Sequence, residues 1–546
     1  MKIQIRNFLT IIATAIASIC LAQPTSLPLF SGEIEGGALG EVRLVDTLDG
    51  RLRYAITTKV DPDNPADPDL PPSERWFYFM ASGVKDKTLA LDITFNDSKR
   101  PFYSYDNISF SRFSESEVAV ENSTITFTPE RDTLYIAYFT PYTMSRNLQK
   151  ITEWNKVPNV QSFDIGTSMQ GAPLRMLAVA EGLSPKSQII PDKRGRIELA
   201  REDRNRPIVY IHCRIHPSET PCSWHLEAMV ERLIEESEFA NALRQSAIFY
   251  ILPFVNPDGV TQGMSRSDSR GVNMEINYDA SPEVTSPEVV AIKRFFDGIE
   301  ASGFHTSLML NMHSQSATKT SFWTHSAEST SLEYNRRMML LGALTAYDNP
   351  YFKISDLSFS AVKSRYLEGL LFNKFKGRCL SVTFETPYTY YSNNPEGEWV
   401  TLENLAHQGA TSLRAVGDLL GVGARVAVEE PRHSGVNARG VKPLRDTKRT
   451  ATDKKSLYMG RSYLMSRHAG AWAEYRANLT AGRYNIYMWQ VGKLPSKANI
   501  KDLDTTRNEW RKVGSINHQS DGVAKYRHRA TTAGESFDRV IFVKAE

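Results

Sequence analysis

The chain of 546 residues is poor in cysteine, has almost no excess of one charge, and carries no long apolar run after its first 22 residues. Beyond those 22 residues only Cys213, Cys222 and Cys379 remain, and an odd set of three is not a disulfide framework. We expect Cys213 and Cys222 to be small buried side chains, with a bridge between them as the alternative. The net charge of +3 argues against nucleic-acid binding as the main role.

The first 22 residues have the pattern of a secretory signal peptide. Lys2 and Arg6 precede an apolar stretch at 8–21, and Cys20 and Ala22 place small residues at the two cleavage subsites. We therefore predict cleavage after Ala22, a secreted or periplasmic protein, and no integral membrane segment once the signal is removed. A short N-terminal anchor is the alternative, although the apolar stretch is too short for a comfortable span.

The rest of the chain divides into segments of different pattern, and its length predicts two to four domains. Residues 24–130 alternate apolar and polar over short runs between turn residues, which predicts an N-terminal β-sandwich. Residues 131–424 alternate strands with helix-length amphipathic segments, the pattern of an α/β domain. Residues 425–455 lose hydrophobicity and gain positive charge, which favours a flexible linker. Residues 456–546 read as a β-rich, jelly-roll-like domain.

Two features outside the α/β segment invite a ligand-binding interpretation. The acidic, proline-rich run from Asp61 to Asp69 could bind calcium, but its prolines and its lack of a fixed glycine favour a solvated loop. Trp472, Trp489 and Trp510 could bind a sugar, so a glycan or cell-surface contact through the C-terminal domain stays open. We expect them to be core tryptophans of a sandwich instead.

The most informative motif is His216-Pro-Ser-Glu219. Residues 207–212 before it read as a buried strand, and residues 223–236 after it have a helical apolar repeat. The motif therefore falls on a loop at the carboxyl end of a strand, where open α/β sheets bind ligands. A histidine and a glutamate three residues apart can bind one zinc ion from a single turn. A surface histidine beside a solvated acid at a helix start is the alternative interpretation.

Three further apolar strands end in polar residues that are candidates for the same site. Residues 251–255 run into an Asn-Pro-Asp-Gly turn at 256–259, residues 308–312 end at His313, and residues 380–384 end at Glu385. The gaps are 94 residues from Glu219 to His313 and 72 from His313 to Glu385. Gaps of this length fit ligands that a sheet brings together, and they do not fit a zinc finger.

Taken in order, these segments resemble the zinc carboxypeptidase family, and most of all its cytosolic-carboxypeptidase-like branch. The matching pieces are His216-Pro-Ser-Glu-Thr220, Asn256-Pro-Asp-Gly-Val260, Arg266, Gly271-Val272, His313 and Thr383-Phe-Glu385. Upstream, Trp76-Phe-Tyr-Phe79 and residues 135–143 resemble the β-domain and entry segment of that branch, so the resemblance covers roughly residues 30–425. It implies a carboxypeptidase-like α/β fold with a central mixed sheet and flanking helices.

The resemblance also assigns roles to individual residues. It implies that His216, Glu219 and His313 bind zinc and leave the fourth position to water. Glu385 is then the general base, and Arg266 stabilises the developing oxyanion of a peptide or peptide-like substrate. Tyr366, 19 residues before Glu385, takes the place of the tyrosine that caps the substrate.

The sequence departs from the family where its members bind the free carboxylate of the substrate. Their Asn-Arg pair falls on Glu275 and Ile276, and Ile276 cannot form a bidentate carboxylate contact. Asn273 stands where an aspartate often supports the first zinc histidine, and an amide oxygen can accept the same imidazole N–H. In one interpretation Arg270 or another basic residue binds the carboxylate, and the protein remains a metallocarboxypeptidase.

Two other functions stay open because of this departure. The protein could be an amidase, a deacylase or a peptidoglycan-type peptidase whose substrate lacks a free carboxylate. It could also be a non-catalytic binding protein on a peptidase scaffold, anchored to a cell wall or glycan through its C-terminal domain. Retention of all three metal ligands together with Glu385 favours the enzyme.

Overall fold

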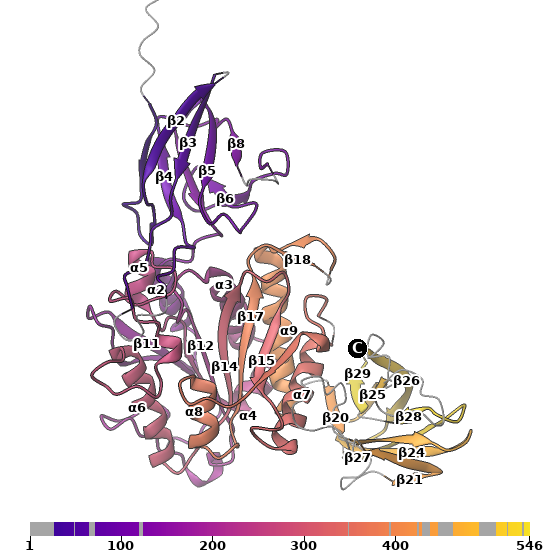
Figure 1. Ribbon diagram of the computed structural model, residues 1–546. Coiled ribbons are helices and arrows are strands. Elements are labelled where there is room, and N and C mark those ends of the chain that lie inside the picture. The colour runs from indigo at the N-terminus through magenta and orange to yellow at the C-terminus, as the bar shows by residue number, and fades with distance from the viewer. Residues whose placement is uncertain are drawn as a thin grey trace, which may run out of the picture.

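The computed structural model describes residues 27–48, 50–64, 71–119, 124–347, 349–392, 395–422, 425–428, 437–445, 462–490, 509–520, 522–537 and 540–545. An N-terminal β unit stands on one end of a central α/β domain, and a C-terminal β unit lies beside that domain (Figure 1). The predicted signal peptide lies outside the described residues. No helix in the described ranges has the length and apolar character that a bilayer crossing requires.

The N-terminal unit consists of two sheets that share one core. The first has the order β1 (Leu29–Ser31), β4 (Tyr78–Ser82), β9 (Thr133–Ala137), β6 (Phe102–Ser104) and β7 (Ser111–Arg112). The second has the order β2 (Val42–Leu48), β3 (Arg51–Ile56), β5 (Thr88–Ile93) and β8 (Ile125–Phe127). Tyr54 and Leu91 of the second sheet pack in one cluster with Phe79 and Ile136 of the first. The predicted N-terminal sandwich is present, but its predicted end at residue 130 is too early, because β9 lies inside the first sheet.

The central domain is built on one mixed sheet of eight strands, as predicted. Its order is β10 (Val160–Thr167), β11 (Pro173–Val179), β13 (Ile248–Leu252), β12 (Ile208–Cys213), β14 (Thr306–Gln315), β17 (Leu380–Pro387), β15 (Ser321–His325) and β16 (Leu357–Ser360). The inner strands β13, β12, β14 and β17 are parallel. β11 runs antiparallel to both of its neighbours, and β15 runs antiparallel to β17 but parallel to β16. The parallel strands end at one edge, so the residues that follow them can converge.

Helices cover both faces of this sheet. They are α2 (Met144–Trp154), α3 (Thr220–Ile234), α4 (Glu238–Ser246), α5 (Pro257–Gln262), α6 (Pro287–Ala301), α7 (Leu332–Ala346), α8 (Leu367–Lys374) and α9 (Leu402–Leu419). Along β12, Val209 and Ile211 belong to the cluster that includes α3, α7 and α9, whereas Tyr210 belongs to the one with α6 and α8. Successive strand side chains point to opposite faces, and a strand buried on both faces is apolar over most of its length.

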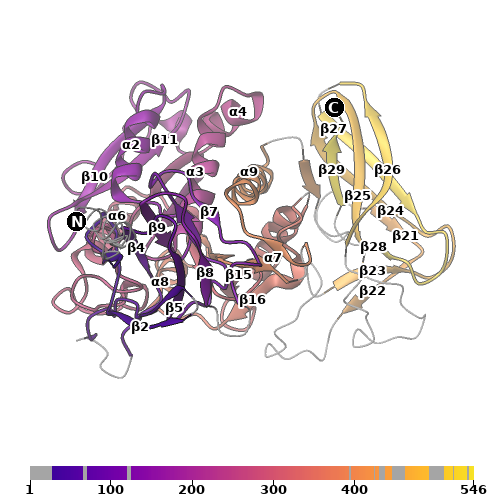
Figure 2. The same cartoon turned by 90° about the horizontal axis from the view of Figure 1, so that it is seen from above.

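The C-terminal unit is made of antiparallel strands, which agrees with the predicted β-rich domain. The first sheet has the order β20 (Arg425–Val428), β29 (Val540–Lys544), β25 (Gly482–Gln490) and β26 (Glu509–His518). The second has the order β21 (Asn437–Arg439), β24 (Trp472–Leu479) and β27 (Gly522–Arg529). The third has the order β22 (Val441–Arg445), β23 (Ser462–Ser466) and β28 (Ser536–Phe537). Figure 2 shows this unit beside α7 and α9, and Ile541 of β29 belongs to the hydrophobic cluster that contains those helices.

The predicted flexible linker is wrong for part of its length. Within residues 425–455, the segments 425–428 and 437–445 form β20, β21 and β22, which pair with β29, β24 and β23 of the C-terminal unit. Positive charge averaged over the segment concealed two short runs of apolar residues mixed with basic ones, Arg425-Val-Ala-Val428 and Val441-Lys-Pro-Leu-Arg445. Residues 429–436 and 446–455 lie outside the described part of the chain.

Candidate active site

A buried arginine, Arg214, holds the loop at the end of β12 in place through hydrogen bonds, and no sequence pattern indicates this role. Arg214 has a positive φ of 59°, and its side chain is buried. Its guanidinium donates hydrogen bonds to the carbonyl oxygens of Pro217 and Tyr142 and to Ser223 Oγ, at 2.9, 3.0 and 3.2 Å. These contacts satisfy a buried charge with fixed acceptors and hold the turn that carries His216. A lone arginine after a strand has no periodic signal, so only the structure reveals this role.

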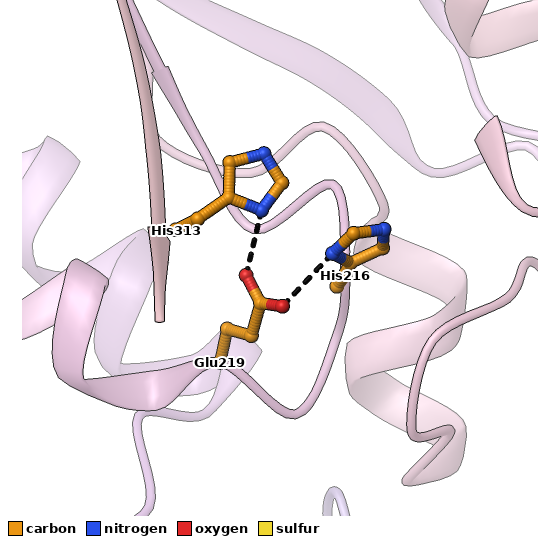
Figure 3. A group of neighbouring side chains, drawn as sticks. All are labelled: His216, Glu219 and His313. Carbon is orange, nitrogen blue, oxygen red and sulfur yellow. Dashed lines mark hydrogen bonds and ion pairs between the residues drawn. The ribbon is translucent and has the colours of Figure 1, made fainter. Parts of the chain in front are cut away.

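Glu219 lies between the two predicted histidine ligands. Its Oε1 is 2.8 Å from His216 Nδ1 and its Oε2 is 2.8 Å from His313 Nδ1 (Figure 3). His216 and Glu219 come from the β12–α3 turn, and His313 comes from β14. All three side chains are buried, and one ligand atom from each lies within 4.8 Å of the others. The sheet therefore brings together the three residues predicted from the motif.

This donor set fits a zinc ion. Two imidazole nitrogens and one carboxylate oxygen are ligands that zinc takes in sites with an open fourth position. Both histidines turn Nδ1 toward the shared carboxylate, which leaves Nε2 free to contact a second partner. Burial alone would lower the pKa of His313, but the carboxylates of Glu219 and Glu275 outweigh it and hold that pKa well above its usual value. The carboxylates of Glu219 and Glu275 thus place negative charge beside His313, as a bound cation requires.

Each histidine contacts an oxygen at its outer nitrogen. His216 Nε2 lies 3.2 Å from Asn273 Oδ1, as expected for the residue that supports the first histidine. His313 Nε2 lies 3.4 Å from Glu275 Oε2. An oxygen beside the outer nitrogen of an imidazole favours the ring orientation and the tautomer that a metal needs. Glu275, expected only to repel a carboxylate, therefore has a partner among the metal-binding candidates.

A buried polar network continues behind Glu275. Asn311 Nδ2 donates to Glu275 Oε1 at 3.1 Å and to Glu368 Oε1 at 2.9 Å. Asn311 Oδ1 accepts a 2.6 Å hydrogen bond from His212 Nε2. Glu368 also accepts from Thr383 Oγ1 at 2.6 Å. A fully bonded buried network of this kind fixes the position of its members, and Glu275 is one of them.

Glu385 lies beside His313 on the neighbouring strand. The two residues are directly paired in the parallel register of β14 and β17. Glu385 is half-buried, and its Oε2 has no hydrogen-bond partner among the described residues. Burial, together with the negative charges of Glu219 and Glu275, raises the pKa of Glu385 to about 8 against the opposing charges of His313 and Arg266. An unpaired carboxyl group with a pKa near neutrality suits proton transfer.

Arg266 lies on a loop that borders the site. Its side chain is exposed, and its charge acts on both His216 and Glu385. The backbone of this loop is bound by Asp61, which is buried. The prediction of a solvated loop is therefore wrong at Asp61, because a local reading of a charged run takes no account of partners about 200 residues away.

A second arginine reaches the site from the N-terminal unit, and the sequence did not single it out. Arg75 is partly buried, its Nε lies 3.2 Å from Asp97 Oδ2, and its charge interacts with Glu219 and Tyr388. Because Arg75 belongs to a different unit from the metal-binding motif, spacing within the motif could not indicate it.

In the described part of the chain, the contacts of Arg270 and Tyr366 are with residues other than the three metal-binding candidates. Arg270 Nη2 lies 3.2 Å from Asp268 Oδ2 and 3.4 Å from Ser286 Oγ, so it ties its loop to the start of α6. Tyr366 is partly buried and stands at the start of α8, where its backbone bonds to Lys363 and Leu370. Spacing along the sequence indicates which loop carries each residue. It does not indicate which neighbours the side chain contacts, because the conformation of the loop decides that.

Comparison with known proteins agrees with the fold and the site. The family model described as zinc carboxypeptidase matches residues 151–510. Relatives include an uncharacterized protein of Zymomonas mobilis, 30% identical over 232 residues, covering 41% of this chain and 55% of that protein. Cytosolic carboxypeptidase 1 of Danio rerio is 27% identical over 259 residues, covering 44% of this chain and 22% of that protein. The chain thus spans about half the length of the first relative and about a fifth of the second.

Solved structures show the same fold. A metallo-carboxypeptidase from Burkholderia cenocepacia has a TM-score of 0.57 at 22% identity, covering 71% of this chain and 98% of that one. A metallo-carboxypeptidase from Pseudomonas aeruginosa, in complex with (2-guanidinoethylmercapto)succinic acid, has a TM-score of 0.55 at 20% identity, covering 72% of this chain and all of that one. Because the family model matches more than half of the residues of this chain, the chain belongs to the zinc carboxypeptidase family.

Proposed function

We propose that the protein is a zinc-dependent metallocarboxypeptidase that hydrolyses peptide bonds. The observation that carries the proposal is the meeting of His216, Glu219 and His313 in one buried cluster, with Glu385 on the adjacent strand. Family membership supports the same activity. A cluster of metal ligands beside an acid of raised pKa is the arrangement that metal-assisted hydrolysis requires.

In this proposal each residue has one chemical role. His216, Glu219 and His313 would hold zinc, and the ion would supply Lewis acidity toward the scissile carbonyl and toward water. Glu385 accepts a proton from the attacking water and delivers it to the nitrogen that leaves when the carbon–nitrogen bond breaks. Arg266 provides positive charge next to the oxygen on which negative charge develops. The exposed side chain of Arg266 lets a substrate reach it.

Recognition of a terminal carboxylate requires a cation that residues 275 and 276 do not supply. Glu275 and Ile276 stand where relatives carry an Asn-Arg pair, and Glu275 already contacts His313 and Asn311. A carboxylate-binding cation must therefore come from elsewhere, and we propose Arg75, whose charge already acts on Glu219. The absence of an arginine at 276 equally favours the second candidate, an amidase, deacylase or peptidoglycan-type peptidase that requires no free carboxylate.

One comparison separates these candidates. The zinc-loaded protein is given a set of peptides and the C-terminal amides of the same peptides, and kcat/KM is measured for each. A carboxypeptidase cleaves the free acids at least ~100-fold better, because a bidentate arginine contact is lost with the amide. In the Arg75→Gln variant that preference should fall, with Arg175→Gln, a partly buried arginine that pairs with Asp164, as the control. Equal cleavage of acid and amide would assign the second function instead.

Export through a signal peptide is a further part of the proposal, supported by the charge and apolar pattern of residues 1–22. N-terminal sequencing of the protein recovered outside the cytoplasm should begin at Gln23, and a chain that still begins at Met1 would contradict it.

A glycan or cell-surface contact through the C-terminal unit is the last part. The partly buried Trp472, with the Arg527 guanidinium 4.0 Å from its ring, is the candidate contact among the described side chains. Trp472→Ala should reduce co-sedimentation with purified cell-wall glycan, and unchanged sedimentation would make the tryptophan a packing residue.

A further inference from the structure

One carboxylate of the N-terminal unit is bonded to three consecutive residues of the catalytic domain. Asp61 Oδ1 accepts the backbone N–H of Ser265 at 2.7 Å, and its Oδ2 accepts the N–H groups of Arg266 and Ser267 at 2.8 and 2.9 Å. Ser267 Oγ donates to the same Oδ2 at 3.0 Å. Asp61 is only 4% exposed, so all four bonds are shielded from water. Hydrogen bonds to an ionised, buried acceptor are about twice as strong as neutral ones.

The contact extends along both segments. Lys59 Nζ donates to the Gln262 carbonyl at 2.7 Å, and the Trp76 N–H donates to Ser265 Oγ at 2.9 Å. At Gly271, which has a φ of +87°, an added Cβ would lie 2.1 Å from the Asp63 carbonyl oxygen. A glycine is required at such a close approach of two backbones. Residues 59–63 and Trp76 therefore fit against residues 262–271, with Asp61 in the middle of the segment 59–63.

The other side of the same loop is tied to the metal-binding turn. The Ser265 carbonyl accepts hydrogen bonds from Ser218 Oγ at 2.6 Å and from Ser218 N–H at 3.2 Å. Asn256 Nδ2 donates to the Ser267 carbonyl at 3.0 Å. The N–H groups of residues 265–267 thus point to Asp61, whereas the carbonyl oxygens of Ser265 and Ser267 point to Ser218 and Asn256. Arg266 is the one side chain of residues 265–267 that is exposed, and its charge acts on His216 and Glu385.

We propose that Asp61 is a positioning residue for Arg266, so that the N-terminal β unit forms a working part of the active site. The inference rests on the proposed role of Arg266 in stabilising the oxyanion. A preorganised charge is effective only where it stays fixed as the reaction proceeds. Asp61 fixes the backbone on both sides of the Arg266 Cα, and the guanidinium then has only its own side-chain torsions to order.

The test compares Asp61→Asn with Asp63→Asn, the same change at an exposed position of the same segment. An asparagine at 61 keeps the shape, but its NH2 group faces N–H donors that it cannot accept. We expect kcat to fall about 10- to 100-fold while KM stays within about 2-fold, because small misplacements of a catalytic group have effects of this size. The zinc affinity should be that of the wild type, since Asp61 contacts no metal-binding residue.

A double-mutant cycle identifies the residue through which Asp61 acts. In an Arg266→Ala background, Asp61→Asn should lower kcat by less than about 2-fold, because the group that it positions is already absent. An equal loss in both backgrounds would overturn the inference, as would wild-type kcat in folded Asp61→Asn protein. Wild-type turnover of Arg266→Ala itself would overturn the proposed role of Arg266 and the inference with it.

Two further measurements test the inference without the kinetics of Asp61→Asn. Amide hydrogen exchange of residues 265–267 should become faster in Asp61→Asn and stay slow in Asp63→Asn, and this result does not require any turnover. If the exchange rates of residues 265–267 do not change in Asp61→Asn, the positioning role is overturned, and this holds even for a protein without peptidase activity. Should Asp61→Asn not fold, Ser267→Ala removes one of the four donors, and it should lower kcat in the wild type but not in Arg266→Ala; an equal loss in both would overturn the inference.

Discussion

Glu275 Oε2 lies 3.4 Å from His313 Nε2, on the side of the imidazole away from Glu219. Glu275 occupies the sequence position where relatives begin their carboxylate-binding pair, but its contacts are with a metal-binding candidate and with Asn311. A carboxylate behind a ligating histidine raises the basicity of that ligand. The departure from the family thus places an acid where it can strengthen the metal site.

Glu275→Gln should weaken zinc binding by about 10-fold, within the range found when such outer partners of ligating histidines are changed. The glutamine keeps an oxygen for His313 but removes the negative charge. Competition with a chelator of known affinity measures the effect. Glu283→Gln, on the exposed surface nearby, is the matched control. Equal zinc affinity in Glu275→Gln and in the control would show that Glu275 does not support the metal.

Glu385→Gln should lower kcat by about 100- to 10,000-fold, the usual contribution of general acid–base catalysis, with the zinc content unchanged. The reason is that an amide cannot accept the proton of the attacking water. Steady-state kinetics and metal analysis on the same sample measure both quantities, and Glu403→Gln, exposed on α9, serves as the control. A non-catalytic binding protein would show no turnover to lose and unchanged ligand affinity.

Glu288 should make the stability of the folded protein depend on pH. Its side chain is buried at the start of α6, and burial raises its pKa to about 7 from an ordinary 4.5. The folded state therefore holds this proton more tightly than the unfolded state. The stability that the protonated group contributes is complete below about pH 4.5 and is lost as the pH rises through about 7.

Glu288→Gln, which does not titrate, should consequently gain stability relative to the wild type between pH 5 and pH 8. The expected gain is about 2–3 kcal/mol, from a shift of this size at about 1.4 kcal/mol per pKa unit. Urea unfolding of both proteins at the two pH values measures it. Glu300→Gln, exposed on the same helix, should show no such trend. A stability difference between Glu288→Gln and the wild type that stays constant with pH would rule out the raised pKa.

The metal-binding cluster could be predicted from the sequence because its information is local. His216 and Glu219 share one turn, and His313 and Glu385 each follow an apolar strand whose burial is evident from composition. Parallel strands end at the same edge of a sheet, so identifying the strands was enough to bring the residues together. The register that pairs His313 with Glu385 agrees with that expectation.

The contacts that surround the cluster could not be predicted in the same way. Asp61 and Arg75 act on the catalytic domain from another unit, across about 150 to 200 residues, and neither lies in a periodic pattern. The basic segment 425–455 shows the opposite error, because an average over thirty residues concealed strands of three to five residues. Sequence patterns predict elements well, but they do not report which side chain of another unit completes a site.

The proposed chemistry depends on one zinc ion held by His216, Glu219 and His313. Anomalous diffraction from crystals of the protein, collected on both sides of the zinc absorption edge, tests this arrangement. We expect a single strong peak about 2.0–2.2 Å from His216 Nδ1, His313 Nδ1 and a Glu219 carboxylate oxygen. A zinc-supplemented crystal with no peak between these side chains, or with its strongest peak at another group of residues, would show that they do not form the zinc site.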